Sequence, residues 1–189
     1  MKALRDRIIQ EATVSSGGQV NVDSFLNHQV DTLLLGQIAD ELLRRLDLTG
    51  VTKVLTAETS GIALAAVCAY RFGLPLVYAK RVRSEPSDAP VYKSTVFSFT
   101  YQHPTTFVCA KAFLSETDTV LIVDDFLAGG QSMRGLVDIV RQSGAKLAGI
   151  AVAIEKKFEG GGDRLRAEGH KVEALATITK ADASGITFA

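Results

Sequence analysis

The sequence predicts an α/β protein in which a central parallel sheet is flanked by helices, with a small lobe at the amino terminus. From residue 53 onward, short apolar runs alternate with segments of helical periodicity, a pattern typical of βαβ units. Residues 120–123 are Val-Leu-Ile-Val, as expected of a strand that is buried on both faces of a parallel sheet. Residues 1–30 lie outside the alternation, and we expect them to form the small lobe over one end of the sheet.

The remaining elements follow from periodicity and turn residues. The predicted helices are 1–11, 31–46, 62–71, one from Gln131 onward, and a helical turn at 163–168. The predicted strands are 53–57, 75–79, 96–99, 105–110, one from Val120, 147–154 and 172–178, with a short strand before Asn21. Turns are expected at 15–18 and near 102–104, and residues 82–93, which are polar and contain two prolines, are expected to form a mobile loop.

Composition limits the possible classes of protein. The chain has 189 residues, of which 47% are hydrophobic, so we expect a single domain over 1–189 with a substantial core. Because 21 Lys and Arg balance 21 Asp and Glu, charge gives no reason to expect nucleic acid or a membrane surface as a partner. The charged first residues do not resemble a signal peptide, so we expect a cytoplasmic protein. Cys68 and Cys109 lie in apolar runs and are expected to be buried thiols.

The most informative segment follows the strand that begins at Val120. Asp124 and Asp125 end the apolar run, and a loop of small residues then leads into a helix. Ligands bind at the carboxyl ends of strands in open α/β sheets, where glycine amides and a helix amino terminus attract anions. Carboxylates suit hydroxyl groups or a metal ion, so the segment predicts a sugar-phosphate site. The alternative is that the acids only cap the helix and the loop is an ordinary turn.

A second loop occupies the equivalent position after the strand at 53–57. Its residues are Glu58, Thr59, Ser60 and Gly61. Thr59 and Ser60 are good helix caps, so the loop is either a cap or a second anion-binding turn. It contains no cation, and the nearest ones are Lys80, Arg81 and Arg83 at the edge of the predicted mobile loop. Such a cluster is either merely solvated or supplies positive charge to a ligand.

Three segments together resemble the type I phosphoribosyltransferases. Residues 120–132 resemble the motif with which that family binds phosphoribosyl diphosphate, and residues 22–29 and 152–158 resemble the purine-pocket segments of its bacterial xanthine-specific members. The resemblance extends over nearly the whole chain. It departs at Gly129, where the family usually has Thr, and at Ser132, where Thr is common.

The resemblance implies a purine-salvage glycosyltransferase that moves a 5-phosphoribosyl group from 5-phospho-α-D-ribose 1-diphosphate to N9 of xanthine, giving xanthosine 5'-monophosphate and diphosphate. It implies catalytic roles for Asp124, Asp125 and Arg81, the two acids contacting the ribose hydroxyls. The implied ligands of the 5-phosphate are Ala128, Gly129, Gly130, Gln131 and Ser132. Those of the leaving diphosphate are Glu58, Thr59, Ser60 and Gly61. Those of the purine are Val20, Asn27, Lys156 and Phe158.

Lys156 and Phe158 are two residues apart, so on a strand or its extension they would share one face. The aromatic ring would then stack on a base while the ammonium donates to its 6-oxo group, which disfavours adenine. From the residues alone, Lys156 could equally be a solvated strand end beside a core Phe, and Asn27 a turn residue. Hypoxanthine–guanine enzymes of the family have Asp where Ala128 stands, so no general base is evident.

The resemblance also implies Mg²⁺, carried by the diphosphate rather than held in a cage of protein ligands, and a homodimer. Two alternatives remain. One is an enzyme of the same class that prefers guanine or hypoxanthine. The other is a non-catalytic regulator that senses the sugar diphosphate and controls transcription, for which the sequence offers no basic stripe.

Overall fold

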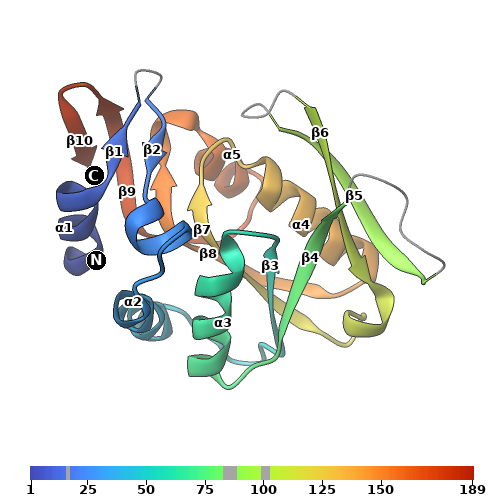
Figure 1. The fold of residues 1–189 in the computed structure, drawn as a ribbon. Coiled ribbons are helices and arrows are strands. Elements are labelled where there is room, and N and C mark those ends of the chain that lie inside the picture. Colours follow the sequence, from blue (N-terminus) through green and yellow to red (C-terminus); the bar gives the residue numbers. More distant parts are fainter. Residues whose placement is uncertain (16–17, 83–88, 99–102) are drawn as a thin grey trace.

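The computed structural model describes residues 1–15, 18–82, 89–98 and 103–189 (Figure 1). Its main strands are β3 (Lys53–Ala57), β4 (Leu76–Val82), β5 (Val91–Ser98), β6 (His103–Ala110), β7 (Thr119–Leu127), β8 (Lys146–Lys156), β9 (Val172–Asp182) and β10 (Gly185–Phe188). Its α-helices are α1 (Lys2–Glu11), α2 (Thr32–Arg45), α3 (Gly61–Phe72), α4 (Gln131–Ser143) and α5 (Gly161–Ala167). Short elements are β1 (Thr13–Val14), β2 (Val20–Asn21), the π-helical turn η1 (Asp23–Asn27), and the 3-10 turns η2 (Lys111–Phe113) and η3 (Lys157–Glu159).

The described strands β3 to β10 form one sheet in the order β10-β9-β8-β7-β3-β4-β6-β5. From β9 to β4 the neighbours run parallel, whereas β10 at one edge and β6 and β5 at the other pair antiparallel. Figure 1 shows helices on both faces of this sheet. The predicted α/β fold, with a central and mostly parallel sheet flanked by helices, is confirmed.

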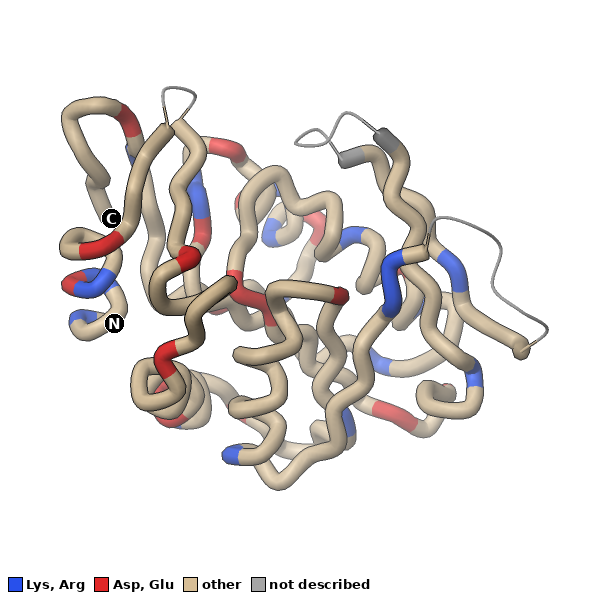
Figure 2. The backbone as a smooth tube through the Cα atoms, viewed as in Figure 1, with Lys and Arg blue, Asp and Glu red and all other residues tan. Residues whose placement is uncertain are grey.

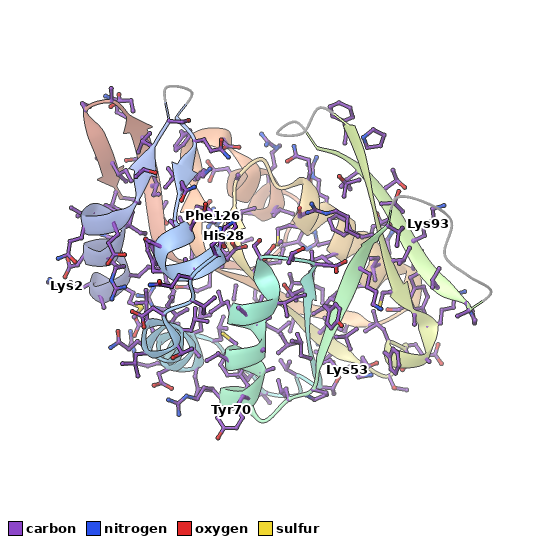
Figure 3. The ribbon with its side chains drawn as sticks, viewed as in Figure 1. Lys2, His28, Lys53, Tyr70, Lys93 and Phe126 are labelled. Carbon is purple, nitrogen blue, oxygen red and sulfur yellow. The ribbon has the colours of Figure 1, made fainter. Side chains whose placement is uncertain are left out.

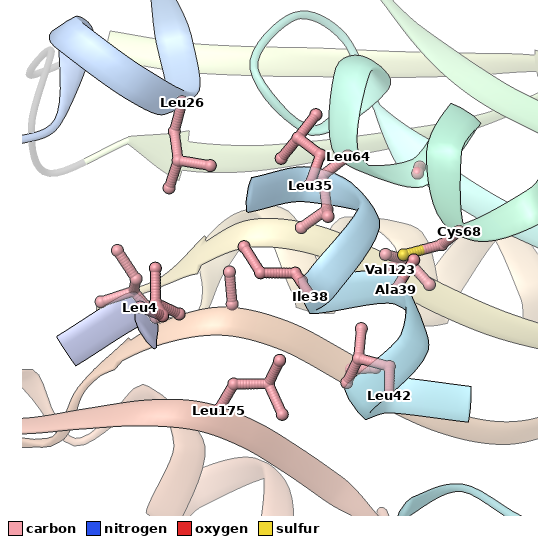
Figure 4. Close-up of a cluster of buried hydrophobic side chains, with 14 of the residues drawn as sticks. Leu4, Leu26, Leu35, Ile38, Ala39, Leu42, Leu64, Cys68, Val123 and Leu175 are labelled. Carbon is pink, nitrogen blue, oxygen red and sulfur yellow. The ribbon is translucent and has the colours of Figure 1, made fainter. Parts of the chain in front are cut away.

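Two hydrophobic cores lie on the two faces of the sheet. Side chains from α1, α2 and α3 form the core shown in Figure 4, and side chains from α4 and α5 form the other. The apolar run of β7 serves both cores, since Leu121 and Val123 join the first while Val120 and Ile122 join the second. Its burial on both faces, predicted from the sequence, is therefore confirmed. Both cysteines are buried, as expected.

Local signals explain where the helices begin and end. The Asp31 carboxylate accepts the backbone N–H groups of Leu33 and Leu34 at 3.0 Å each, which caps the start of α2. Gly73, with φ +68°, and Gly144, with φ +75°, adopt the left-handed conformation that ends α3 and α4. No helix formed by the described residues is both long and apolar enough to cross a membrane.

Three expectations for strands and loops need correction. β5 begins at Val91, inside the segment expected to be a mobile loop, because Val91–Ser98 pairs along its whole length with β6. His103 and Pro104 belong to β6, opposite Ser98 and Phe97, rather than to a turn. β10 was not expected, and it forms because Gly185–Phe188 folds back on β9. Arg83 and residue 102 lie outside the described residues.

Candidate active site

A cleft of about 520 Å³ opens where β7 and β8 end and α4 begins. Most of the residues selected from the sequence line it: Val20, Asn27, Ser60, Arg81, Asp124, Asp125, Ala128, Gly129, Gly130, Gln131, Ser132 and Lys156. Glu58, Thr59, Gly61 and Phe158 are not part of the lining. Segments that are more than 130 residues apart in the chain therefore meet at one site.

Asp124 and Asp125 form a buried acidic pair on the floor of the cleft, with 6% and 3% of their surface exposed. The Ser60 hydroxyl donates to Asp125 Oδ1 at 3.0 Å, and the Asp125 N–H donates to Asp124 Oδ1 at 3.0 Å. Burial, and secondly the negative charge of Asp125, raises the pKa of Asp124 well above its usual range, which Arg81 partly opposes. The pair therefore suits a ligand that brings hydroxyl donors or a cation.

The amino end of α3 lies directly against this pair. A Cβ atom on Gly61 would lie 2.1 Å from Asp124 Oδ1 and 2.3 Å from the Thr56 hydroxyl oxygen, so only glycine fits there. Ser60 contacts Asp125 from the same helix end. Both carboxyl groups therefore reach the start of α3, although the two residues are adjacent on β7.

Ala128 to Ser132 lead from β7 into the first turn of α4, and we call these five residues the phosphate loop after the role predicted for them from the sequence. Gly130 has φ +85°, a conformation that side chains rarely adopt, and it makes the sharp turn into α4. All five residues line the cleft at the start of this helix of 13 residues. Because the first N–H groups of a helix have no partner within the helix and its amino end is positive, this wall of the cleft is suitable for an anion.

Lys156, the last residue of β8, also lines the cleft. Its residue surface is 8% exposed, and its ammonium lies 5.2 Å from the centre of the Phe126 ring, labelled in Figure 3, and 3.8 Å from Glu159 Oε1. Val20 and Asn27, from β2 and η1, line the cleft too. These residues offer an aromatic surface, a hydrogen-bond donor that is nearly desolvated and an amide, which together suit an oxo-substituted heterocycle.

Phe158 does not share a face with Lys156. The chain leaves β8 at Lys156 and enters the turn η3, so the two-residue period of a strand no longer applies, and Phe158 is 45% exposed. The aromatic residue beside Lys156 is Phe126, on the neighbouring strand β7. The sequence contained a signal for it, since Phe126 directly follows the acidic pair.

The second loop and the nearby cations are only partly in the cleft. Of residues 58–61, only Ser60 lines it, and the peptide bond between Glu58 and Thr59 is cis. Glu58 instead accepts the N–H of Arg81 at 2.9 Å and ties the loop to β4. Arg81 lines the cleft and Lys80, its exposed neighbour on β4, does not. Figure 2 shows segments of Asp and Glu, in red, near the centre of the molecule.

Sequence reasoning missed several residues of the lining. They are Gln19, Val96, Thr105, Phe107, Phe126, Leu127, Met133, Glu159 and Arg164. Most are core or strand residues of ordinary type, and no local pattern distinguishes them. Arg164 is the notable omission, because it comes from α5, more than thirty residues beyond the phosphate loop.

The described residues contain no group of three or more His, Cys, Asp or Glu side chains that could hold a metal ion by itself. The adjacent carboxyl groups of Asp124 and Asp125 are hard oxygen ligands of the type that Mg²⁺ accepts, and they lie beside a wall suited to phosphate. The residues present therefore fit a magnesium ion that is shared with a phosphorylated ligand.

Comparison with known proteins agrees with this geometry. The model of the phosphoribosyl transferase domain family matches residues 22–180. Similar curated proteins include the xanthine phosphoribosyltransferases of Heliobacterium modesticaldum, 46% identical with all of both chains covered, and of Bacillus cereus, 41% identical over all of this chain and 95% of that one.

Solved structures with a similar fold include adenine phosphoribosyltransferases. The one from Trypanosoma brucei has a TM-score of 0.80 at 17% identity, covering 96% of this chain and 82% of that chain. The one from Rhodothermus marinus has a TM-score of 0.76 at 20% identity, covering 94% of this chain and 99% of that chain. At these identities the likeness concerns the fold alone.

Proposed function

Since the chain belongs to the phosphoribosyl transferase domain family, we propose that it is a xanthine phosphoribosyltransferase of purine salvage. It transfers the 5-phosphoribosyl group of 5-phospho-α-D-ribose 1-diphosphate to N9 of xanthine, giving xanthosine 5'-monophosphate and diphosphate. The membership expected from residues 120–132 is confirmed by the family match over 22–180. Relatives named for this activity over the full length of the chain support the choice of base.

The donor occupies the half of the cleft between the phosphate loop and the acidic pair. Amides of the phosphate loop and the Ser132 hydroxyl receive the 5-phosphate, and Asp124 and Asp125 receive the ribose hydroxyls. Arg81, on the wall formed by β4, adds positive charge near the leaving diphosphate. Ser60 and its loop also contact the diphosphate, through hydroxyl and amide groups. Magnesium carried by the diphosphate, with Asp124 and Asp125 as candidate protein ligands, would neutralise part of the charge on the leaving group. Positioning and electrostatics together therefore account for the rate.

The base occupies the other half, beneath residues 1–30. Lys156 donates to the 6-oxo group, Phe126 and Val20 provide apolar contacts, and Asn27 both donates and accepts at the edge of the base. Adenine is disfavoured because its 6-amino group would face the buried ammonium without an acceptor. Xanthine loses a proton more readily than other 6-oxopurines, and a cation favours that anion, so a protein base at N7 or N9 is not required.

The proposal depends on one observation: the buried ammonium of Lys156 shares a single cleft with the acidic pair and the phosphate loop. A cytoplasmic homodimer with residues 1–30 covering the base is part of the proposal and rests on the resemblance to the family. The regulator alternative is not favoured, because 21 Lys and Arg are balanced by 21 Asp and Glu and Figure 2 shows both kinds of residue distributed along the described chain.

Competition among xanthine, guanine and hypoxanthine, with the donor and Mg²⁺ present, tests the choice of base. Xanthine should have the highest kcat/KM, and Lys156→Met should lower it roughly 10- to 100-fold, the loss expected for a hydrogen bond from a charged donor. Lys157→Met is the matched control, because that neighbour is exposed and outside the cleft. If guanine or hypoxanthine has the highest kcat/KM, xanthine is not the preferred base. If no nucleotide forms with any of the three bases, the protein is not a phosphoribosyltransferase of this kind.

A further inference from the structure

The phosphate loop contacts α5, a short helix that has no residue among those assigned above to the donor or the base. The N–H of Gly161 donates to the carbonyl of Ala128 at 3.1 Å. A Cβ atom on Gly161 would lie 2.1 Å from that same carbonyl oxygen and 2.6 Å from the Gly130 nitrogen. The helix and the loop are therefore in direct backbone contact, with no room for a side chain between them.

Arg164 makes the second connection, from the next turn of α5. One guanidinium nitrogen donates to the Gly129 carbonyl and to the Glu159 carbonyl, at 3.0 Å each. Gly160, with φ +72°, leaves the space in which the guanidinium lies, since a Cβ atom there would be 2.9 Å from Arg164 Nη1. The planar guanidinium thus joins the phosphate loop to η3, the turn that follows the purine-contacting Lys156.

α5 itself is anchored to the sheet. Arg166 donates to both oxygens of Glu155 at 2.7 and 2.8 Å, and the side chain of Glu155 is 2% exposed. Gly162 lies against the same carboxylate, because a Cβ atom there would be 1.9 Å from Glu155 Oε1. A two-bond pair with a buried acid gives the helix a fixed position from which to hold the loop.

Peptide geometry gives these contacts a consequence for the ligand. In a planar trans peptide, the C=O of one residue and the N–H of the next point in opposite directions. Because α5 holds the carbonyls of Ala128 and Gly129, the N–H groups of Gly129 and Gly130 point away from α5. Both glycines line the cleft, so those N–H groups become available to an anion there.

We propose that Arg164 is a positioning residue for the sugar-phosphate donor: by holding the Gly129 carbonyl, it orients the loop amides that receive the 5-phosphate. The inference rests on the proposed function for the identity of the donor. It does not rest on xanthine as the base, because it concerns only the half of the cleft that receives a phosphate. Arg164 also lines the cleft, so a direct charge contact with the phosphate is the competing role.

Isothermal titration calorimetry with 5-phospho-α-D-ribose 1-diphosphate and Mg²⁺, without a purine, tests the positioning role. Arg164→Ala should bind on the order of tenfold more weakly, as expected for the loss of a charged hydrogen-bond donor near the surface. Its thermal melting should match that of the unaltered protein, and Arg164→Lys should recover only part of the affinity, because an ammonium lacks the planar fork. Arg141→Ala, which removes a side chain that is 82% exposed on α4, is the control and should bind normally.

The dependence of the dissociation constant on salt separates the two roles. A positioning residue leaves the slope of affinity against ionic strength unchanged in Arg164→Ala, whereas a direct contact with phosphate makes the slope shallower. Unchanged affinity, or weaker affinity with a shallower slope, overturns the inference. Ribose 5-phosphate serves as a second probe, and if neither phosphate compound binds the unaltered protein the inference fails. Failure with xanthine alone, with donor binding intact, counts against the choice of base and leaves the role of Arg164 standing.

Discussion

Replacing Gly161 by Ala should displace the phosphate loop although Gly161 itself does not line the cleft. The added methyl group would lie 2.1 Å from the Ala128 oxygen, 2.6 Å from the Gly130 nitrogen and 2.7 Å from the Gly129 carbonyl carbon. Since real Cβ atoms essentially never approach closer than 3.0 Å, the Ala128 oxygen has to withdraw by about 0.9 Å. All three atoms belong to the backbone of the loop, so no side chain can turn aside to make room.

A displacement of about 1 Å in a positioning element costs roughly 100-fold in rate. We therefore expect kcat/KM for the donor to fall on the order of 100-fold in Gly161→Ala, with a loss of unfolding free energy of about 1–3 kcal/mol from overpacking. Initial rates at saturating xanthine measure the first effect and urea denaturation the second.

Gly36→Ala is the matched control for this change. Gly36 lies within α2, and the nearest atom to an added Cβ would be an Arg71 nitrogen at an ordinary 3.8 Å. Alanine is the better helix former, so this variant should keep full activity and gain up to about 1 kcal/mol of stability. If Gly161→Ala keeps kcat/KM within about threefold of the unaltered value, the loop is not held against α5 and its position does not control the rate.

Two further changes test the electrostatics of the site. Burial, and secondly the charge of Asp125, raises the pKa of Asp124 in the folded protein. Between the unfolded pKa, near 4, and this raised folded pKa, the folded protein keeps a proton that the unfolded chain has released. The free energy of unfolding therefore falls as pH rises through this range. Asp124→Asn should therefore melt at a higher temperature than the unaltered protein at pH 7, and this difference should shrink toward pH 3. The variant should also lose activity. Equal melting temperatures at pH 7 would count against a neutral Asp124. Arg166→Ala leaves the Glu155 carboxylate, 2% exposed, without its cation, and should lower the unfolding free energy by about 3 kcal/mol in urea titrations. Arg44→Ala, at a side chain that is 69% exposed, is the control and should change the free energy of unfolding by less than about 0.5 kcal/mol. An equally small change in Arg166→Ala would show that the Arg166–Glu155 pair does not anchor α5.

Local sequence patterns were sufficient to predict most of the fold and the part of the cleft formed by the acidic pair and the phosphate loop. The apolar run at Val120, the acids that end it and the small residues before α4 are contiguous, so strand, turn and helix signals identify them together. Local patterns failed at β5, because its first residues resemble a loop and form a strand only by pairing with β6. Edge strands depend on a partner elsewhere in the chain, and prolines nearby hide the pattern further.

The sequence by itself determined the α/β class, and neighbouring residues alone predicted the acidic pair and the phosphate loop, whereas Lys156 was selected through the resemblance to the family. Tertiary structure decided that Phe126 rather than Phe158 accompanies Lys156, since the chain leaves β8 and the adjacent strand supplies the ring. It also brought α5 behind the phosphate loop, where Gly161 and Arg164 hold backbone carbonyls. Contacts with backbone atoms leave no residue pattern, because every residue has the same carbonyl, and only the packing of distant segments selects which one is held.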